Sequence, residues 1–153
     1  MLQYFLENDL VYYSDKEITD WKEAIQESCT QLLQKKIIDQ SYVEEIIQCV
    51  NQHGPYIVIV PGVAMPHSSE KSKGVHDTAI SFTKMKNPIV FENEGEEEVT
   101  ASLFFTLAAK DSEAHMRNIQ RLSEMLMTDG IIERLIQTHS LEEFKAVEKE
   151  YNL

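Results

Sequence analysis

Apolar residues recur at helical spacing in the first third of the chain. From Thr19 to about Lys36 they fall on one side of a helical projection, and charged residues fall on the other. This pattern predicts an amphipathic helix capped by Thr19. A second helix is predicted from Ser41 to about Gln52, because Ser41-x-x-Glu44 matches a capping box and Gly54-Pro55 provides a stop.

The middle of the chain changes to strand patterns. The apolar run Tyr56–Val60 lies between two prolines, which predicts a strand buried on both faces, and a loop is expected from Pro61 to Gly74. Alternation predicts a half-exposed strand over Ala79–Met85. A turn is expected at Lys86–Pro88 and a short strand at Ile89–Phe91. A solvated acidic loop, Glu92–Glu98, and an apolar strand, Val99–Ala108, are expected to follow.

Helical spacing returns in the last third. Asp111 or Ser112 is expected to cap a helix that runs to about Asp129, followed by shorter helices near Ile131–Thr138 and Ser140–Tyr151. No internal repeat or linker-like segment interrupts the chain. We therefore expect one domain over residues 1–153, of the α/β class, with a mixed parallel and antiparallel sheet flanked by helices. One sequence does not give the order of the strands.

Charge and composition narrow the possible partners. The 153 residues carry a formal net charge of −12, and such a surface repels nucleic-acid phosphates and anionic lipid. No apolar run approaches the length of a membrane-spanning helix, and the N-terminus lacks the basic region and cleavage site of a signal peptide. We therefore expect a cytoplasmic protein without nucleic-acid binding or membrane insertion. Cys29 and Cys49 have no C-x-x-C spacing and fall within helical patterns, which favours buried thiols over a disulfide or zinc.

Among the five histidines, His67 has the setting that best suits chemistry. It follows the predicted buried strand, in the segment Pro61–Ser68, where Pro66 restricts the approach of the backbone. A neutral imidazole is nucleophilic near pH 7, and its phosphoramidate transfers readily to another nucleophile. Ser68 and Ser69 are candidates for weak phosphoryl-stabilising donors, although both also fit as solvated loop residues. The alternative to a chemical role is that His67 merely ends a strand and forms local hydrogen bonds.

His115 is the second candidate. It shares an apolar stripe with Ile119, Leu122 and Leu126 and lies in the first turn of its helix, where bound anions are favoured. A histidine at such a position also fits as a satisfied core residue. A metal site built from His67, His76 and His115 is a weaker alternative, because no metal-binding histidine spacing is present. No nucleotide-binding or hydrolase motif is present either, and we expect no cofactor.

These residues carry a resemblance to a known family. The segment Gly54–His67 reads G-P-Y-x-V-I-x-P-G-x-A-M-P-H, which resembles the phosphorylation-site segment of IIA components of the bacterial phosphoenolpyruvate-dependent sugar phosphotransferase system. It is more similar to the L-ascorbate branch than to the mannitol/fructose branch. The resemblance extends through Lys86–Phe91 and Leu107–His115 and back to the helix that contains Trp21, so it covers most of the chain.

The resemblance implies a role for each candidate. His67 would accept a phosphoryl group from the phosphocarrier protein HPr and pass it to a cysteine of a IIB component during sugar uptake, with L-ascorbate a possible sugar. His115 would be the second active-site histidine, which stabilises the phosphoryl group. The family fold, a mixed sheet flanked by helices, agrees with the fold expected above. Mannitol-type proteins carry an arginine upstream of the acceptor, and this chain has none between Gln48 and His53; Lys71 or Lys73 is a hypothetical substitute.

Two other functions fit the same residues. IIA-like domains also act as regulatory modules that report their phosphorylation state to a transcription regulator, and His67 would look the same there. A metal-binding or purely structural domain is the third interpretation. The transported sugar stays open, because no residue of a IIA protein contacts the sugar. The oligomeric state stays open as well.

Overall fold

A mixed five-stranded sheet forms the centre of the protein in the computed structural model, which describes residues 1–68, 72–92 and 97–153. The strand order is β1-β4-β5-β3-β2. β1 runs parallel to β4 and β3 parallel to β5, whereas the β4–β5 and β2–β3 pairs are antiparallel. The strands are β1 (Val11–Tyr13), β2 (Val58–Val60), β3 (Gly62–Ala64), β4 (Ala79–Phe91) and β5 (Val99–Ala108).

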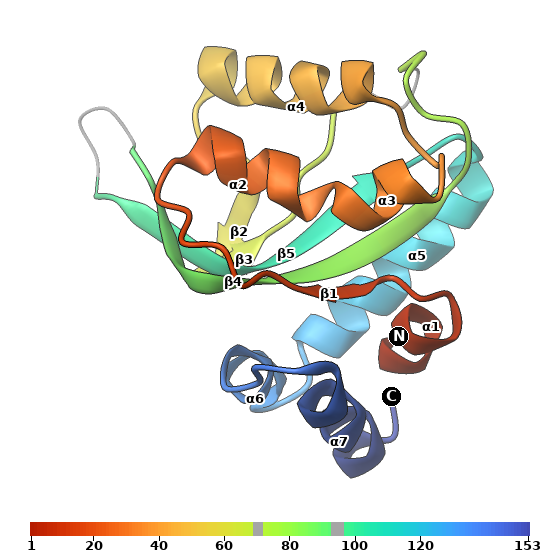
Figure 1. The fold of residues 1–153 in the computed structure, drawn as a ribbon. Coiled ribbons are helices and arrows are strands. Elements are labelled where there is room, and N and C mark those ends of the chain that lie inside the picture. Colours follow the sequence, from red (N-terminus) through yellow and green to blue (C-terminus); the bar gives the residue numbers. More distant parts are fainter. Residues whose placement is uncertain (69–71, 93–96) are drawn as a thin grey trace.

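Helices cover both faces of this sheet, so the predicted single-domain α/β fold is confirmed (Figure 1). One face carries α2 (Trp21–Ser28), α3 (Thr30–Gln34) and α4 (Gln40–His53). The other face carries α1 (Leu2–Glu7), α5 (Ser112–Leu126), α6 (Ile131–Ile136) and α7 (Leu141–Tyr151). Within the described residues, no helix has the length and apolar character needed to cross a membrane.

An aromatic cluster joins the second helical layer to the sheet. The ring of Phe82 in β4 lies 4.9 Å from that of Phe144 in α7 and 5.5 Å from that of Phe105 in β5, and Phe5 of α1 packs on all three. All four side chains are fully buried. Burial of each ring contributes about 1.5–3 kcal/mol, which fixes α1 and α7 on this face.

The first helices differ from the prediction in their ends. The region predicted as one helix from Thr19 to Lys36 is two helices, α2 and α3, that break at Cys29, and Asp20 caps α2 by accepting from the Glu23 N–H. Asp39, not Ser41, caps α4 by accepting from the Ser41 N–H. In both cases a nearby aspartate takes the capping role, because its short carboxylate is as good an acceptor there as a hydroxyl.

The strands around the predicted loop are also corrected. Only Val58–Val60 of the Tyr56–Val60 run is strand, and it lies at the sheet edge, where Ile59 is 44% exposed. The chain then turns at Pro61 into β3, so the loop predicted from Pro61 to Gly74 begins with a strand. The inner strand before His67 is therefore β3 and not β2, because β3 pairs with both β2 and β5.

The two strands predicted within 79–91 form one continuous strand, β4. Its first seven residues are buried on both faces and are not half-exposed. Pro88 fits inside β4 because the pairing with β5 shifts register between Lys84 and Ile89, where no ladder N–H is required of it. The acidic segment after β4 lies partly outside the described residues, which resume at Glu97.

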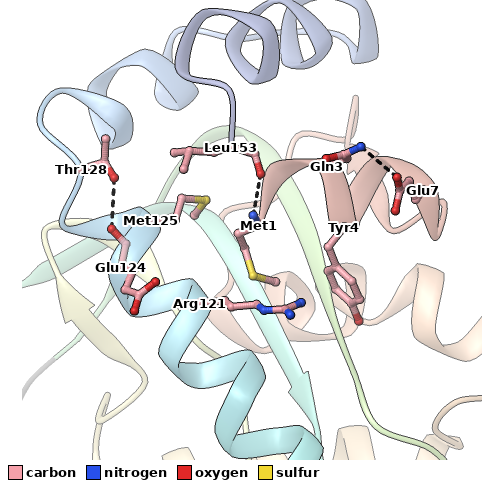
Figure 2. Close-up of a pocket in the computed structure, with 9 residues that line it drawn as sticks. All are labelled: Met1, Gln3, Tyr4, Glu7, Arg121, Glu124, Met125, Thr128 and Leu153. Carbon is pink, nitrogen blue, oxygen red and sulfur yellow. Dashed lines mark hydrogen bonds between the residues drawn. The ribbon is translucent and has the colours of Figure 1, made fainter.

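The last third follows the prediction closely. Asp111 caps α5, which ends at Leu126 and not at Asp129, and Ser140 caps α7 through the Glu143 N–H. The N-terminal elements α1 and β1 were not predicted. Figure 2 shows where the start of α1 meets the end of the chain: the Met1 amino group donates to the Leu153 carbonyl at 2.6 Å, beside a pocket of about 450 Å³.

Candidate functional site

His67 lies at the end of the sheet where β3 and β5 both finish. The backbone that leads to it is held on two sides: Met65 N–H donates to Ile57 O at 2.8 Å, and Leu107 N–H donates to Pro66 O at 2.9 Å. Pro66 is buried, while His67 itself is half-buried. The loop thus presents the imidazole from a backbone tied to β5, so little freedom is left to lose when a reactant binds.

The hydrogen bond of the imidazole defines its tautomer. His67 Nδ1 lies 2.6 Å from the carbonyl oxygen of Met65, two residues earlier. A carbonyl only accepts, so Nδ1 carries the proton and donates. In the neutral ring the lone pair is therefore on Nε2, which becomes the nucleophilic nitrogen.

Tyr56 holds the same histidine from the other side. Its hydroxyl donates to the His67 carbonyl oxygen at 2.6 Å, and its ring meets the imidazole edge to face, with centroids 5.2 Å apart at 88°. Partial burial raises the pKa of the Tyr56 hydroxyl to about 12, so it stays a donor over the physiological range. The hydrogen bond holds the backbone of His67, and the ring contact restricts the rotation of the imidazole.

Tyr42 of α4 connects the loop to the end of β5. Its buried hydroxyl donates to Leu107 O at 2.7 Å and accepts from the Ser68 N–H at 3.2 Å. Burial raises the pKa of this hydroxyl, which keeps it protonated. One side chain therefore fixes both the residue after His67 and the strand that leads toward α5.

α5 brings His115 to the same place. Asp111 caps the helix, and the Thr78 hydroxyl accepts from the backbone N–H groups of Lys110 and Asp111 at 2.9 and 2.8 Å. His115 then lies in the first turn and is half-buried. The start of the helix, with its positive dipole end, is thus fixed beside the loop.

A pocket of about 310 Å³ brings the two histidines together. His67 and Ser68 line it from the loop, and His115, Met116 and Ile119 line it from α5, with the remaining wall made by Tyr42, Met65, Leu107 and Ala109. Such a concave site with two imidazoles and a helix start suits a small anion. A second hollow of about 300 Å³ lies beside it and is lined by Cys49, His53, Tyr56, His67 and Ser68.

The other predicted candidates lie in different surroundings. Ser69 and Lys71 are outside the described residues, and Lys73 is exposed and lines neither pocket. His76 is exposed and pairs with Asp39 at 2.9 Å, away from His67. In the described part of the chain no three histidine, cysteine or acidic side chains are arranged to hold a metal ion.

Tyr42 and Tyr56 are the site residues that sequence reasoning did not single out. Tyr42 is on the buried side of α4, and a buried tyrosine needs a partner for its hydroxyl, which is a signal that could have indicated its role. The partner itself, the Leu107 carbonyl, lies 65 residues away and is visible only in the fold.

Fold and site together define a small α/β protein with two histidines in one anion-sized pocket at the end of its sheet. The family model "Phosphoenolpyruvate-dependent sugar phosphotransferase system, EIIA 2" matches residues 4–150. The chain belongs to this family of phosphotransferase components, as its motifs indicated.

Two groups of relatives support this assignment. The mannitol-specific cryptic phosphotransferase enzyme IIA component of Escherichia coli K12 is 36% identical over 138 residues, which is 90% of this chain and 89% of the relative. The solution structure of the mannitol-specific cryptic phosphotransferase enzyme IIA CmtB from Escherichia coli matches with a TM-score of 0.78 at 31% identity, and the match covers 97% of both chains. An ascorbate-specific PTS EIIA component of Salmonella typhimurium is 31% identical over 120 residues, 78% of this chain and 76% of its own.

The fold also matches a protein solved with its partner. The complex of enzyme IIA for mannitol with phosphorylated enzyme IIB for mannitol, from Escherichia coli, gives a TM-score of 0.72 at 22% identity over 91% of this chain and 94% of that chain. At this identity the likeness is one of fold.

Proposed function

We propose that residues 1–153 act as one phosphocarrier domain in which His67 accepts a phosphoryl group from phospho-HPr and passes it to a cysteine of a IIB component. The observation that carries this proposal is the 2.6 Å bond from His67 Nδ1–H to the Met65 carbonyl. It leaves the Nε2 lone pair for attack, in a ring that also lines the pocket shared with His115.

Phosphoryl transfer takes place in two steps at Nε2 of His67. Nε2 of His67 forms a bond to phosphorus while the donor's N–P bond breaks and its electron pair returns to the donor imidazole. The Nδ1 proton stays in place, and the Met65 carbonyl stabilises the positive charge that phosphorylation adds to the ring. In the second step a cysteine thiolate of the partner attacks phosphorus, the N–P bond breaks, and Nε2 regains its lone pair. Alignment and charge stabilisation dominate the barrier to such transfers.

His115 is the residue that we assign to charge stabilisation. It lies in the first turn of α5, where the helix dipole favours a phosphoryl anion, and it lines the same pocket as His67. A ring N–H directed at a phosphoryl oxygen would add a charge-assisted hydrogen bond. Ser68 lines this pocket too, and its hydroxyl is a further candidate donor.

The rim of the site offers apolar contact for a partner protein. Met116, next to His115, is 62% exposed, and Tyr56, beside His67, is 37% exposed. Exposed methionine and tyrosine side chains suit the transient interfaces that a phosphoryl relay requires. The ascorbate-like G-x-A-M-P-H segment leads us to assign the partner to the ascorbate-type branch, with L-ascorbate as the sugar of the system.

Phosphorylation with labelled phosphoenolpyruvate, enzyme I and HPr tests the assignment. His67→Ala should abolish labelling, whereas His115→Ala should still be labelled but pass the group on at least about 10-fold more slowly. His76→Ala is the matched control, because His76 is exposed and lies outside the pocket, and it should behave like the native protein. NMR of the labelled protein should place the phosphoryl group on Nε2.

Labelling of His67→Ala, or a phosphoryl group on Nδ1, would contradict the proposal. The branch is tested separately, by the rate of transfer to purified IIB proteins. We expect faster transfer to an ascorbate-type than to a mannitol-type IIB, and the reverse order would reject L-ascorbate. Capture of a transcription regulator with no transfer to either IIB would favour the regulatory role instead.

A further inference from the structure

Lys84 is buried in the sheet with no neighbour that neutralises it at close range. It lies in β4 opposite Tyr13 of β1 and is only 6% exposed. No described residue accepts a hydrogen bond from its ammonium group or lies within ion-pair distance of it. Lysine commonly buries its apolar stem in this way while its charged end stays accessible. The ammonium nitrogen of Lys84 is not among the fully buried polar atoms that lack a partner, and the residue lines a pocket that this cation can face.

The direction of the Lys84 side chain follows from its neighbours in β4. The ring of Phe82, two residues earlier, packs on Phe144 of α7, whereas the Thr83 hydroxyl reaches the Ser28 carbonyl on the opposite face. Because side chains alternate along a strand, Lys84 points with Phe82 toward the α6–α7 side. Burial lowers the pKa of its ammonium group, and the carboxylate of Glu143 in α7 acts against that shift.

A pocket of about 200 Å³ lies at this position. Its wall contains two lysines, Lys84 and Lys86, together with His139 from the α6–α7 connection, and is completed by Tyr13, Ser14, Asp15 and Met85. Lys86 is half-exposed and forms a 3.4 Å ion pair with Glu17. Asp15 and Glu143 are the nearby carboxylates, and neither comes within ion-pair distance of the Lys84 ammonium.

This pocket is separate from the one that holds His67. Ala79, at the start of β4, pairs with Ala108 at the end of β5, beside the histidine pocket. Lys84 lies five positions further along β4, which is roughly 17 Å at the rise of an extended strand. Figure 1 shows that this part of β4 lies over α6 and α7, whereas the start of α5 lies at the other end of the sheet.

We infer that the Lys84 pocket is a binding site for a small oxyanion, a phosphate or a carboxylate. Such a ligand would accept a charge-assisted hydrogen bond from the Lys84 ammonium group, with which no described carboxylate forms an ion pair. Lys86 and a ring N–H of His139 are placed on the same wall to complete the contacts. The same wall also contains Asp15, and Lys86 pairs with Glu17, so Lys84 is the cation there that no described carboxylate pairs at close range.

NMR titration of the full chain with inorganic phosphate, and separately with acetate, tests this inference at constant ionic strength. We expect saturable shifts of backbone amides at 13–15, 84–86 and 139 with one or both anions, and the anion that saturates defines the ligand class. Lys84→Met should weaken binding at least about 10-fold. Methionine has a similar length and no charge, so this variant is expected to fold. Lys22→Met is the matched control, because Lys22 is an exposed lysine on α2 and should leave binding unchanged.

A second readout does not depend on assigning resonances. An anion that binds only the folded protein raises its melting temperature, so phosphate or acetate should stabilise the native chain and not Lys84→Met. Shifts that never saturate, or equal binding by native protein and Lys84→Met, would overturn the site. The result is independent of phosphoryl transfer, because His67→Ala should bind the anion as the native protein does.

Discussion

Removal of one hydroxyl group, in Tyr42→Phe, tests how the loop that carries His67 is held against β5. In the native protein this hydroxyl donates to Leu107 O at 2.7 Å and accepts from Ser68 N–H at 3.2 Å. Phenylalanine keeps the ring and its packing in the core, so the substitution removes only these two bonds. It also leaves a backbone N–H next to His67 without the acceptor that it has in the native structure.

The expected cost follows from the burial of the group. Tyr42 is 2% exposed, so water does not readily replace the lost hydroxyl. A buried polar group left without its partner costs about 1–3 kcal/mol, and we expect the free energy of unfolding to fall by about that amount. Transfer should slow as well, because the residue after His67 is then less firmly positioned.

Urea unfolding measures the first effect, and the rate of labelling from phospho-HPr measures the second. Tyr13→Phe is the matched control: its hydroxyl bonds to Thr138 Oγ1 at 2.7 Å, away from the histidine pocket. This control should lose about 0.5–1.5 kcal/mol of stability and none of its transfer rate. If Tyr42→Phe unfolds like the native protein and transfers at the native rate, or if Tyr13→Phe slows transfer equally, the role given to Tyr42 is wrong.

Two further predictions concern residues elsewhere in the fold. Burial raises the pKa of the Cys29 thiol to about 12, whereas Cys49 is partly exposed. At pH 8 a thiol reagent should therefore modify Cys49 at least roughly 1000-fold faster than Cys29. The Cys49→Ser variant should show no fast phase of modification, and a fast phase in that variant would contradict the prediction. Gly74→Ala should lower the free energy of unfolding in urea by about 1–3 kcal/mol, because the added methyl group would lie 2.7 Å from the backbone nitrogen of Tyr42. Ser72→Ala, two residues away, should lower it by less. Equal losses in the two variants would rule out the steric explanation.

Long periodic segments and their chemistry were predictable from the chain alone. α4, α5 and α7 were expected near their observed positions, because each has a clear apolar face and a polar residue able to cap it. The family was also identified from the sequence, through the segment around His67 and the second histidine at position 115. These features depend on residue type and spacing, which a single sequence contains in full.

Strand positions were less predictable, because an apolar run does not show which neighbours will cover it. Val58–Val60 was expected to be buried, yet it is an edge strand, and the inner strand is the shorter β3. Pro88 was expected in a turn between two strands, but a register shift against β5 accommodates it within β4. α1 and β1 are too short to give a clear period, and packing on the aromatic cluster around Phe82 stabilises them.

Some features of the candidate site were likewise predictable from the sequence, and others depend on the tertiary structure. The sequence by itself determined the candidates for the reactive group, because an imidazole after Pro66 and another in the first turn of a helix are local features. Only the tertiary structure decided that both line one pocket, that the Met65 carbonyl sets the tautomer, and that Tyr42 ties the loop to β5. These contacts join residues up to 65 positions apart, and their formation depends on the packing of the whole sheet rather than on any local preference.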